Sequence, residues 1–565
     1  GTLADSIPCP EIRNRNNTTM DNARFVLVVF FFFLSVMLYQ QWQIDYGPKP
    51  EIPQAVAGAP KNPDVPGGQA TASGTVATAA STNEAIAIQS KQRILVETDV
   101  IRLELDTEGG DIRVLELKNY PENKDHPEQP IRLFTDQDLI FIAQNGLIGD
   151  EGSAPNHHTL WTTQAQKFAL AEGQDVLRVP LTWTNSHGIE VSKIYILKRG
   201  SYDIALEQTI HNNGKAPLST RQYVQLQRKD PGDKNKDQFV RTYTGGVLYT
   251  PEDKYKKISF KDMASENLDK TAKDGWVAMI QHYFAAAWIP PRGEENGFYT
   301  KSLADNHFVI GAYGPTVEVP AGTSKTLTAE LFAGPKLQHV LEATAPGLDL
   351  TVDYGALTII AKPIFWLLEQ YHKLFNNWGL AIILVTLTLK ALFFRLSAAS
   401  YRSMANMRKL QPKMAELKEK YSSDRQKLNQ AMMELYRKEK VNPLGGCLPI
   451  LVQIPVFISL YWVLIETVEM RQAPFFGWLM DLSAKDPFFI LPVLMGISMF
   501  IQQRLSPPPA DPLQARIMQF FPIMFTGFFA FFPSGLVLYW VVNNLLSILQ
   551  QWYINKTIGA QVAKA

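Results

Sequence analysis

A single lysine interrupts an apolar stretch that is long enough to span a bilayer. The stretch is Trp378–Leu396 (WGLAIILVTLTLKALFFRL), and Lys390 lies twelve residues after Trp378. At a rise of about 1.5 Å per residue, the lysine would lie roughly 18 Å from the start of such a helix, in the far half of the hydrocarbon. A cation at that depth destabilises the helix by a few kcal/mol unless it faces water or a polar partner. Lys390 is therefore a candidate functional residue.

Two interpretations of Lys390 are open. Its flexible stem can carry the ammonium group to the nearer membrane surface, where Arg395 lies five residues further on. Alternatively, the charge faces a polar interior. Thr386 favours this second interpretation, because it precedes Lys390 by four residues and so places a hydroxyl on the same helical face.

Six apolar segments indicate an α-helical membrane bundle that carries one large water-facing domain. Hydrophobic residues make up 46% of the chain and charged residues 19%, but these averages combine two dissimilar parts. We predict six transmembrane helices, of which the last five form a core within residues 378–565. The apolar segments are Phe25–Tyr39, Trp378–Leu396, Cys447–Ile465, Phe488–Leu505, Ile517–Phe532 and Gly535–Ile554.

The first apolar segment has the features of an uncleaved signal anchor. Residues 1–19 are polar and precede Met20, so we expect Met20 to be the native start and the preceding segment to be a non-native or disordered extension. Arg24 precedes the apolar residues, no small-x-small cleavage site follows them, and Trp42 fits an interfacial anchor. Residues 20–46 are thus predicted to form a transmembrane helix whose N-terminus lies in the cytoplasm.

The region between the first two apolar segments divides into three parts. Residues 47–90 are rich in Pro, Ala, Gly, Thr and Ser, which predicts a flexible linker. Residues 91–350 alternate apolar and polar side chains, as at Ile101 and Leu103, with turn signals between short segments. This pattern predicts an antiparallel β-sandwich. Residues 351–377 place apolar side chains at helical spacing, which predicts an amphipathic helix in the outer membrane interface.

The charges of the loops predict the orientation of the spans. Arg395–Lys440 contains twelve basic and five acidic residues, a local balance of +7, whereas Glu466–Asp486 has only Arg471 and Lys485 as basic residues. The positive-inside rule places the first of these loops in the cytoplasm and the second outside. With the N-terminus inside, residues 47–377 are then mainly outside and the C-terminus is cytoplasmic.

Residues 397–440 are predicted to form an antiparallel helical hairpin in the cytoplasm. Apolar residues recur at helical spacing on both sides of Tyr421-Ser-Ser-Asp424, and Ser423 or Asp424 can cap the second helix. The hairpin is either a solvated connector or a docking element for ribosomal RNA or anionic lipid headgroups. The candidate docking residues are Arg408, Lys409, Lys413, Lys418, Lys420, Arg425 and Lys427.

Polar side chains also recur along one face of the last apolar segment, and Gln453 adds an amide to the third. Amides within hydrocarbon must find partners in the bundle, so hydrogen bonding between helices is the simpler explanation for each of them. Together with Thr386 and Lys390, however, they fit a wet cavity shared by several helices. The polar face consists of Tyr539, Asn543, Ser547 and Gln550, with Asn544 and Gln551 beside it.

Patterns typical of catalytic and metal sites are missing from the sequence. Its two cysteines, Cys9 and Cys447, lie far apart, so residues 91–350 have neither a disulfide nor a cysteine-ligated metal site. The nine histidines show no HExxH-type spacing, and no glycine-rich phosphate loop or Gly-x-Ser-x-Gly motif occurs. A net charge of +1 indicates no particular partner. We therefore expect no catalytic residue, no metal and no cofactor.

Four further motifs are long and specific. They are Lys438-Glu-Lys-Val-Asn-Pro-Leu-Gly-Gly-Cys-Leu-Pro449, Arg471-Gln-Ala-Pro-Phe-Phe476, Asp486-Pro-Phe-Phe-Ile-Leu-Pro492 and Phe532-Pro-Ser-Gly-Leu-Val-Leu-Tyr539. Together they resemble the YidC-type membrane protein insertases (the YidC/Oxa family). The resemblance covers Met20 to Ala565, including a periplasmic β-domain of the size found in Gram-negative members. It implies a protein of the bacterial inner membrane, with five core helices around a hydrophilic, positively charged groove.

The resemblance also suggests which residues line that groove. Lys390 stands where many members have an arginine, so the charge is kept but the planar guanidinium is not. Thr386 matches the groove threonine, and Trp540 replaces a tyrosine of the best-studied type, next to Tyr539. The candidate groove residues are Thr386, Lys390, Gln453, Tyr539, Trp540 and Asn543.

By this resemblance the protein is an insertase and chaperone rather than an enzyme. It would insert and fold nascent inner-membrane proteins, alone or with the Sec translocon. The ribosome and membrane lipids would be further partners, and no sequence-specific nucleic acid would be bound. A hydrated groove shortens the apolar path for the polar segment of a client. The hydrophobic segment of the client then enters lipid, gaining about 25 cal/mol per Å² of buried apolar surface.

Two other functions remain open at this point. A secondary transporter that uses Lys390 as a substrate or proton site would need repeated halves with paired broken helices, which the sequence does not show. An envelope enzyme or sugar-binding protein built on residues 91–350 would need a single anchor rather than six spans with polar faces.

Overall fold

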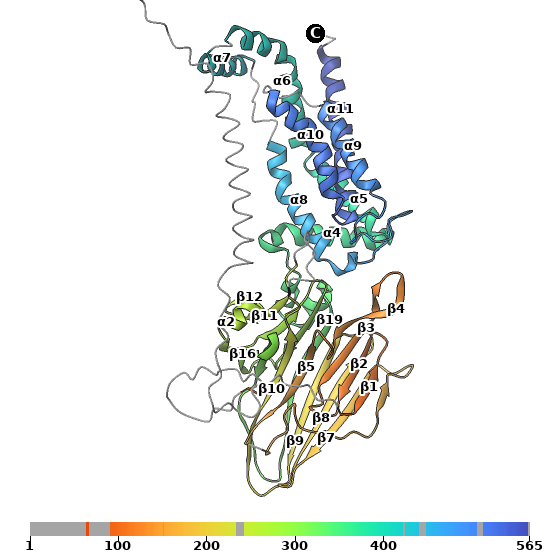
Figure 1. Ribbon diagram of the computed structural model, residues 1–565, viewed down its shortest axis with the longest axis vertical. Helices are drawn as coiled ribbons and strands as arrows, with labels where there is room; N and C mark the ends of the chain where they lie inside the picture. Colours follow the sequence, from red (N-terminus) through yellow and green to blue (C-terminus); the bar gives the residue numbers. More distant parts are fainter. Residues whose placement is uncertain are drawn as a thin grey trace, which may run out of the picture. The chain divides into compact units, whose positions relative to one another are not determined.

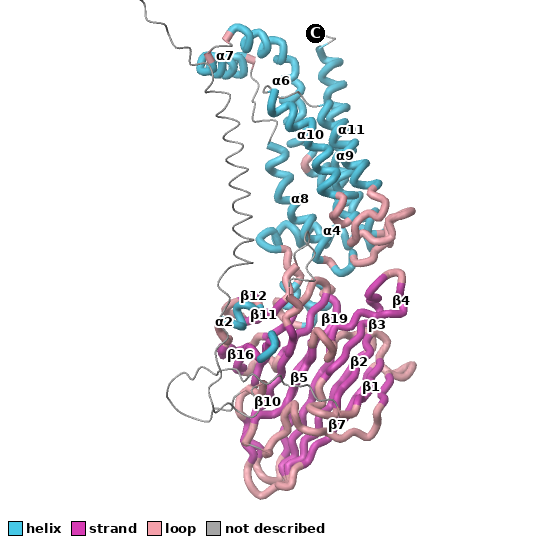
Figure 2. The backbone as a smooth tube through the Cα atoms, in the orientation of Figure 1, coloured by secondary structure: helices cyan, strands magenta, loops and turns pink. Residues whose placement is uncertain are grey.

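The computed structural model describes residues 64–66, 91–150, 152–232, 242–421, 424–439, 448–505 and 512–562. The chain divides into two compact units, Gly1–Ala57 and Gly58–Ala565, and every described residue belongs to the second. The predicted extension at 1–19 and signal anchor at 20–46 lie outside the described residues, as does most of the predicted linker. The second unit contains a β-sandwich followed by a group of helices (Figures 1 and 2).

The sandwich consists of two sheets. The first has eleven strands, with the path β13-β16-β17-β10-β5-β3-β2-β1-β6; in addition β18 pairs with β10 and β4 with β3. The second has eight strands in the order β12-β11-β14-β15-β19-β9-β8-β7. Neighbouring strands are antiparallel except for the parallel pair of β1 and β6. The predicted sandwich is therefore confirmed as a mostly antiparallel one.

In chain order the strands of the sandwich are β1 (Arg93–Glu97), β2 (Ile101–Asp106), β3 (Ile112–Asn123), β4 (His126–Phe134), β5 (Phe141–Ile148), β6 (Lys167–Ala169), β7 (Val176–Thr184), β8 (Ile189–Lys198), β9 (Asp203–Asn212), β10 (Leu218–Lys229), β11 (Gly245–Thr250), β12 (Lys254–Ile258), β13 (Asp269–Lys273), β14 (Trp276–Ile280), β15 (Phe284–Ile289), β16 (Glu295–Leu303), β17 (His307–Tyr313), β18 (Val317–Val319) and β19 (Ser324–Pro335). Two short helices accompany them, α2 (Phe260–Ser265) and α3 (Gln338–Thr344).

Buried and partly exposed side chains alternate along the strands, which explains why these segments form a two-layered structure. Along β9, buried residues alternate strictly with partly exposed ones, so Ile204, Leu206 and Ile210 all face the core. Gln208 shares this face and is fully buried. Its amide donates a hydrogen bond to Asn145 Oδ1 at 3.2 Å, so the polar group is satisfied within the core.

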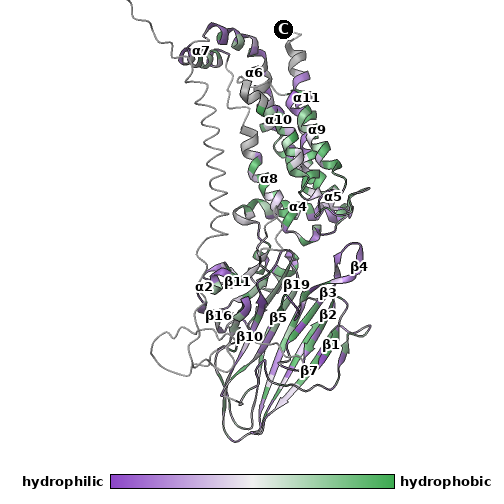
Figure 3. Cartoon of the chain, viewed as in Figure 1, coloured by the Kyte–Doolittle hydropathy of each residue, from purple (hydrophilic) through white to green (hydrophobic). Residues whose placement is uncertain are grey.

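The helices after the sandwich pack mainly around the last one. Helix α11 contacts α5, α6, α8 and α9, while α4 contacts α5 and α8. Figure 3 contrasts α9, which is largely hydrophobic, with α7, which is largely hydrophilic. These helices are α4 (Thr358–Phe375), α5 (Trp378–Leu392), α6 (Phe394–Lys420), α7 (Arg425–Lys438), α8 (Leu448–Glu466), α9 (Ile490–Leu505), α10 (Pro512–Phe529) and α11 (Ser534–Val562).

Large hydrophobic side chains are exposed on the outer faces of several helices. Examples are Ile458 of α8, Ile497 of α9 and Phe520 of α10, which is 61% exposed. Among the described residues, no single helix has both the length and the apolar composition to cross a membrane alone. Two adjoining helices, Trp378–Leu392 and Phe394–Ser403, pass that test together, with a bend of 64° between them. Helix length and composition therefore do not support the predicted count of six spans.

The bend shows that the apolar stretch Trp378–Leu396 is not the continuous helix that its composition predicts. Helix α5 ends at Leu392, Phe393 has φ −89° and ψ 10°, and α6 begins at Phe394. Proline and glycine are both missing near the bend, so no local signal marks it. Both helices pack on α11, and this tertiary packing accompanies the change of direction.

Two adjacent asparagines separate the predicted amphipathic helix from the next one. Asn376 adopts a left-handed conformation with φ 51° after the last turn of α4. Asn377 then caps α5, because its side-chain oxygen accepts a hydrogen bond from the backbone N–H of Leu380 at 2.9 Å. The helix predicted within residues 351–377 is thus α4, which begins at Thr358 and ends at Phe375.

Candidate functional site

Lys390 lies in the last turn of α5 and reaches across to α11. Its Nζ donates a hydrogen bond to Ser547 Oγ at 2.7 Å, and the Ser547 hydroxyl donates to the backbone oxygen of Asn543 at 2.7 Å. Thr386 lies one turn earlier on α5 and is buried, with its hydroxyl donating to Ile382 O at 2.7 Å. We call Thr386, Lys390, Asn543 and Ser547 the Lys390 cluster. The ammonium group is therefore held by a neighbouring helix, although its side chain remains partly exposed.

Three other polar side chains of α11 form hydrogen bonds between helices. Asn544 Nδ2 donates to Ser498 Oγ at 3.1 Å, and Gln551 Nε2 donates to the backbone oxygen of Leu505 at 3.0 Å, which joins α11 to α9. Gln550 Nε2 donates to the backbone oxygen of Phe394 in α6 at 3.3 Å. The simpler explanation of these amides, hydrogen bonding within the bundle, therefore fits all three.

The remaining groove candidates lie along the contact between α8 and α11. The Phe457 ring of α8 lies 4.8 Å from that of Trp540 and 6.0 Å from that of Tyr539, measured between ring centroids. Gln453 precedes Phe457 by one helical turn and is half-buried. Trp540 Nε1 is buried without a hydrogen-bond partner among the described residues. The six candidates thus gather on α11 and its neighbours, but on two separate helix contacts.

The predicted hairpin consists of α6 and α7. Asp424 caps α7, accepting hydrogen bonds from the backbone N–H groups of Gln426 and Lys427 at 3.1 and 3.0 Å. The two helices contact each other through Met414 and Tyr436, where the Tyr436 hydroxyl lies 3.8 Å from the methionine sulfur. The choice of Asp424 over Ser423 as the cap could not be made from the sequence alone.

The basic residues of the hairpin differ in their surroundings. Lys409, Lys413, Lys420 and Lys427 are exposed, and Lys418 is half-buried. Lys413 pairs with Glu439 at 2.6 Å and Lys427 with Asp424 at 3.2 Å, so two of the candidate cations already have acidic partners within the hairpin. Arg408 lies within α6, and Arg425 is the first residue of α7.

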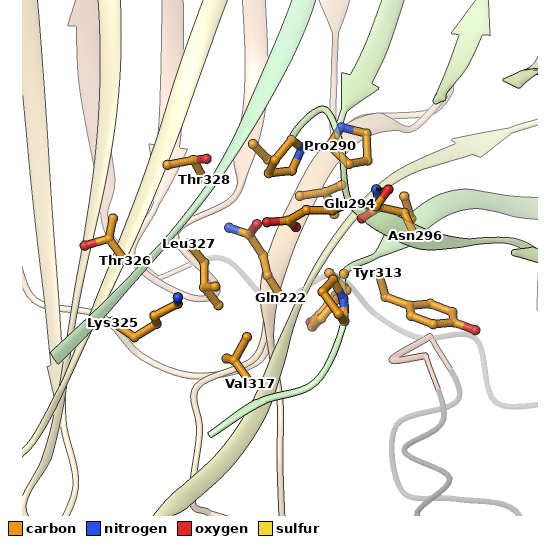
Figure 4. Close-up of a pocket in the computed structure, with 17 residues that line it drawn as sticks. Gln222, Pro290, Glu294, Asn296, Tyr313, Val317, Lys325, Thr326, Leu327 and Thr328 are labelled. Carbon is orange, nitrogen blue, oxygen red and sulfur yellow. Dashed lines mark hydrogen bonds between the residues drawn. The ribbon is translucent and has the colours of Figure 1, made fainter. Parts of the chain in front are cut away.

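A cleft of about 140 Å³ opens in the sandwich between β10, β17 and β19 (Figure 4). Gln222 and Glu294 lie close together in the close-up view, with Tyr313 to one side and Lys325 to the other. Glu294 is the one carboxylate among the residues that line this cleft. Glycoside hydrolysis generally uses a pair of carboxylates. The residues that line this cleft therefore do not include such a pair.

The structure also reveals contacts between the sandwich and the helices that the sequence does not suggest. Lys336, immediately after β19, is buried and its Nζ lies 3.3 Å from Glu466 Oε2 at the end of α8. The same ammonium group donates to Thr351 O at 3.1 Å. Burial lowers the pKa of Lys336, while the Glu466 carboxylate acts in the opposite direction. A separation of 130 residues leaves no local pattern from which this pair could be found.

A half-buried histidine lies at the same contact. His282 Nε2 donates to the backbone oxygen of Ile465 at 2.9 Å, which requires the neutral ring to carry its proton on that nitrogen. Burial, together with the nearby Lys336 and Arg471 cations, lowers the pKa of His282 to about 4. The imidazole is therefore neutral near pH 7 and acts there as a hydrogen-bond donor rather than as a charge.

Comparisons with known proteins cover nearly the whole chain. The family described as the YidC periplasmic domain matches residues 93–367, and the family described as the 60Kd inner membrane protein matches residues 370–561. A membrane protein insertase YidC of Methylococcus capsulatus is 64% identical over 97% of this chain and 100% of its own length. Insertases of the same name from Methylobacillus flagellatus and Pseudomonas fluorescens are 49% and 48% identical, over 96% and 97% of this chain and 99% and 100% of their own lengths. The chain belongs to the YidC family of membrane protein insertases.

Proposed function

We propose that this protein inserts and folds proteins of the inner membrane, and that the Lys390 cluster receives the polar segment of a client. The observation that carries the proposal is the hydrogen bond from Lys390 to Ser547, between helices whose outer faces are apolar. A cation among such helices is unfavourable for stability, so its presence favours a functional role. The insertase relatives match over their full length, so the transporter alternative is not favoured.

The proposed mechanism needs no chemical step. Lys390, Ser547 and the nearby Thr386 provide polar groups part of the way across the bundle, which shortens the apolar path for the polar end of a client. The positive charge attracts an acidic segment most strongly. The hydrophobic segment of the client then moves into lipid, with a gain of about 25 cal/mol per Å² of buried apolar surface. A hydrated groove along α5, α8 and α11 is part of this proposal.

We infer six spans: the signal anchor at residues 20–46, the bent pair α5 and α6, and helices α8, α9, α10 and α11. The basic hairpin supports a cytoplasmic position for α7 and for the part of α6 that follows Ser403, and with it cytoplasmic N- and C-termini. Residues 47–377 are then mainly periplasmic. Trp366 and Leu374 of α4 are 59% and 73% exposed, which supports a position of this helix in the outer membrane interface.

We infer that the hairpin is the docking element for partners on the cytoplasmic side. Lys409 and Lys420 are exposed on α6, where they suit contacts with anionic lipid headgroups or with ribosomal RNA phosphates. Neither contact needs a particular nucleotide sequence. Cooperation with the Sec translocon is a further part of the proposal, because clients with large periplasmic segments need a longer path than one bundle provides.

Substitution of Lys390 tests the proposed site. Lys390→Arg should retain insertion, because it keeps the charge. Lys390→Leu should reduce the insertion of clients with Asp or Glu in the translocated segment by about tenfold, equivalent to about 1.4 kcal/mol of lost interaction. Neutral clients should be affected less. The measurement is insertion of matched acidic and neutral clients into vesicles that contain each variant.

Two controls make the result specific. Lys556→Leu removes an exposed lysine near the end of α11 and should leave insertion unchanged. A cysteine at position 390, with Cys9 and Cys447 replaced by serine, should react with a water-soluble thiol reagent from the cytoplasmic side. If that cysteine is inert and Lys390→Leu inserts acidic clients normally, the lysine only extends to the membrane surface.

A further inference from the structure

A carboxylate from the predicted linker meets two histidines of the sandwich. Asp64 Oδ2 lies 2.8 Å from His157 Nε2, and Asp64 Oδ1 lies 3.0 Å from His158 Nε2. Asp64 and His157 are buried at 2% and 1% exposure, and the His158 side chain is 31% exposed. One ligand atom from each of these side chains lies within 4.8 Å of the other two. The three side chains therefore converge on one point from segments 93 residues apart in sequence.

The surroundings hold these side chains in place. His157 Nδ1 contacts the hydroxyl of Tyr223, a fully buried residue of β10 that also accepts a hydrogen bond from the backbone N–H of His157 at 3.1 Å. Gly109 has φ +79°, and a Cβ there would lie 2.4 Å from the backbone oxygen of His157, so the histidine turn packs directly against glycine backbone. On the linker side, Lys301 Nζ donates to Val65 O at 2.6 Å.

We propose that Asp64, His157 and His158 bind one divalent transition-metal ion, with Zn²⁺ as the best match. Two imidazole nitrogens and a carboxylate oxygen are common zinc ligands, at about 2.0–2.2 Å from the metal, and water can complete a tetrahedral site. The contact of His157 Nδ1 with Tyr223 is typical of metal-binding histidines, whose second nitrogen is usually held by a hydrogen bond. Binding would displace the proton from Nε2 of each histidine, because a ligating nitrogen must be deprotonated, and each neutral ring would then carry its one proton on Nδ1.

This site would also fix the linker. Because Asp64 belongs to the linker and both histidines to the sandwich, the metal would attach residue 64 to the sandwich. The free linker between the predicted signal anchor and the sandwich would then end near residue 64 rather than residue 90. The expectation of no metal rests on local spacing of histidines, which cannot reveal a site completed by a residue 93 positions away.

The test uses the purified full-length protein, freed of metal with a chelator and then dialysed against Zn²⁺. About one Zn²⁺ per chain should bind, and Co²⁺ in its place should give the intense visible absorption of a tetrahedral site. His158→Gln and Asp64→Asn should each weaken binding more than about tenfold. His158 is the less buried histidine, so its variant is the one expected to fold normally. The matched control is His126→Gln, which removes an exposed histidine that lies 3.2 Å from Glu128.

Zn²⁺ should also slow trypsin cleavage after Lys61 in the wild type severalfold, and have no such effect in His158→Gln. The proposal is overturned if the wild type and His158→Gln bind Zn²⁺ equally, or if His126→Gln loses as much affinity as His158→Gln. In that case the three side chains form a hydrogen-bonded cluster without a metal. Unchanged cleavage after Lys61 in the presence of bound Zn²⁺ would contradict the attachment of the linker.

Discussion

At the scale of single residues, the buried pair of Lys336 and Glu466 makes the sharpest prediction about stability. Both side chains are almost fully buried, at 2% and 6% exposure. Among the described residues, Glu466→Leu alone would leave the buried lysine with Thr351 O as its one remaining hydrogen-bond partner. We expect a loss of about 3–5 kcal/mol in the free energy of unfolding, whereas Lys336→Met combined with Glu466→Leu should be nearly neutral. Reversible unfolding in mixed detergent micelles measures both variants.

The control is an exposed pair within a single helix. Lys373 lies 3.2 Å from Glu369 on α4 and its side chain is 60% exposed. Lys373→Met should change stability by less than about 0.5 kcal/mol, because water screens such pairs. A Glu466→Leu variant no less stable than Lys373→Met would show that the buried pair does not hold the sandwich against α8.

Individual residues also show where prediction from sequence reaches its limit. The spacing of four residues between Thr386 and Lys390 predicts that both lie on one face of a helix. In the structure both residues lie in α5, one helical turn apart. The sequence places Ser547 on a polar helical face but does not identify it as the hydrogen-bond partner of Lys390. That pairing depends on the register between α5 and α11, which is set by packing along both helices. Asp64 and Lys336 carry no local pattern, since their partners are 93 and 130 residues away.

At the scale of elements, the hairpin of α6 and α7 should matter for insertion but not for assembly of the core. Deleting residues 409–438 and joining the ends with a short linker should reduce insertion severalfold, because the cytoplasmic docking surface is lost. The contact of Met414 with Tyr436 lies within the hairpin, so its loss should not disturb α5 or α11. Insertion by the deleted protein, normalised to its abundance in the membrane, is the measurement.

A milder variant separates docking from folding. Lys409→Gln with Lys420→Gln removes two exposed charges and leaves the pairs of Lys413 and Lys427 intact. Like the deletion, this double variant should reduce insertion. The control is Lys273→Gln with Lys325→Gln, which removes two charges from the sandwich and should leave insertion unchanged. Normal insertion by both the deletion and the double variant would make the hairpin a solvated connector.

The elements themselves were largely predictable, and the exception has a physical cause. Apolar runs bounded by Pro, Gly and charged residues place α8 and α9 within two residues of their ends in the structure, and the start of α11 within one residue. Helix α11 continues to Val562, eight residues beyond its predicted end at Ile554. The bend at Phe393 was not predictable, because strong turn signals are missing there and the direction of α6 follows from its packing on α11. Period-two alternation predicts the sandwich, but it does not predict the strand order.

At the scale of the whole molecule, the sandwich and the helical core should be separable at Pro335. A cut at residue 300 would leave β17 and β19 without their partners in the two sheets. Removing residues 91–335 takes the sheets away completely and keeps Lys336 beside Glu466 and Tyr354 beside Thr467. We expect this variant to assemble and to keep most of its insertion activity, because the Lys390 cluster lies in α5 and α11.

Extending the deletion to residues 91–354 provides the critical comparison. It removes Lys336 and Tyr354, so Glu466 loses its buried cation and Thr467 its neighbouring hydroxyl. An unpaired buried carboxylate is strongly destabilising, and we expect the longer deletion to lower both the abundance and the insertion activity of the core. Glu466→Leu in the longer deletion should restore part of the abundance, because it removes the unpaired charge. If the shorter deletion is abundant yet inserts nothing, the functional centre lies in the sandwich rather than at Lys390.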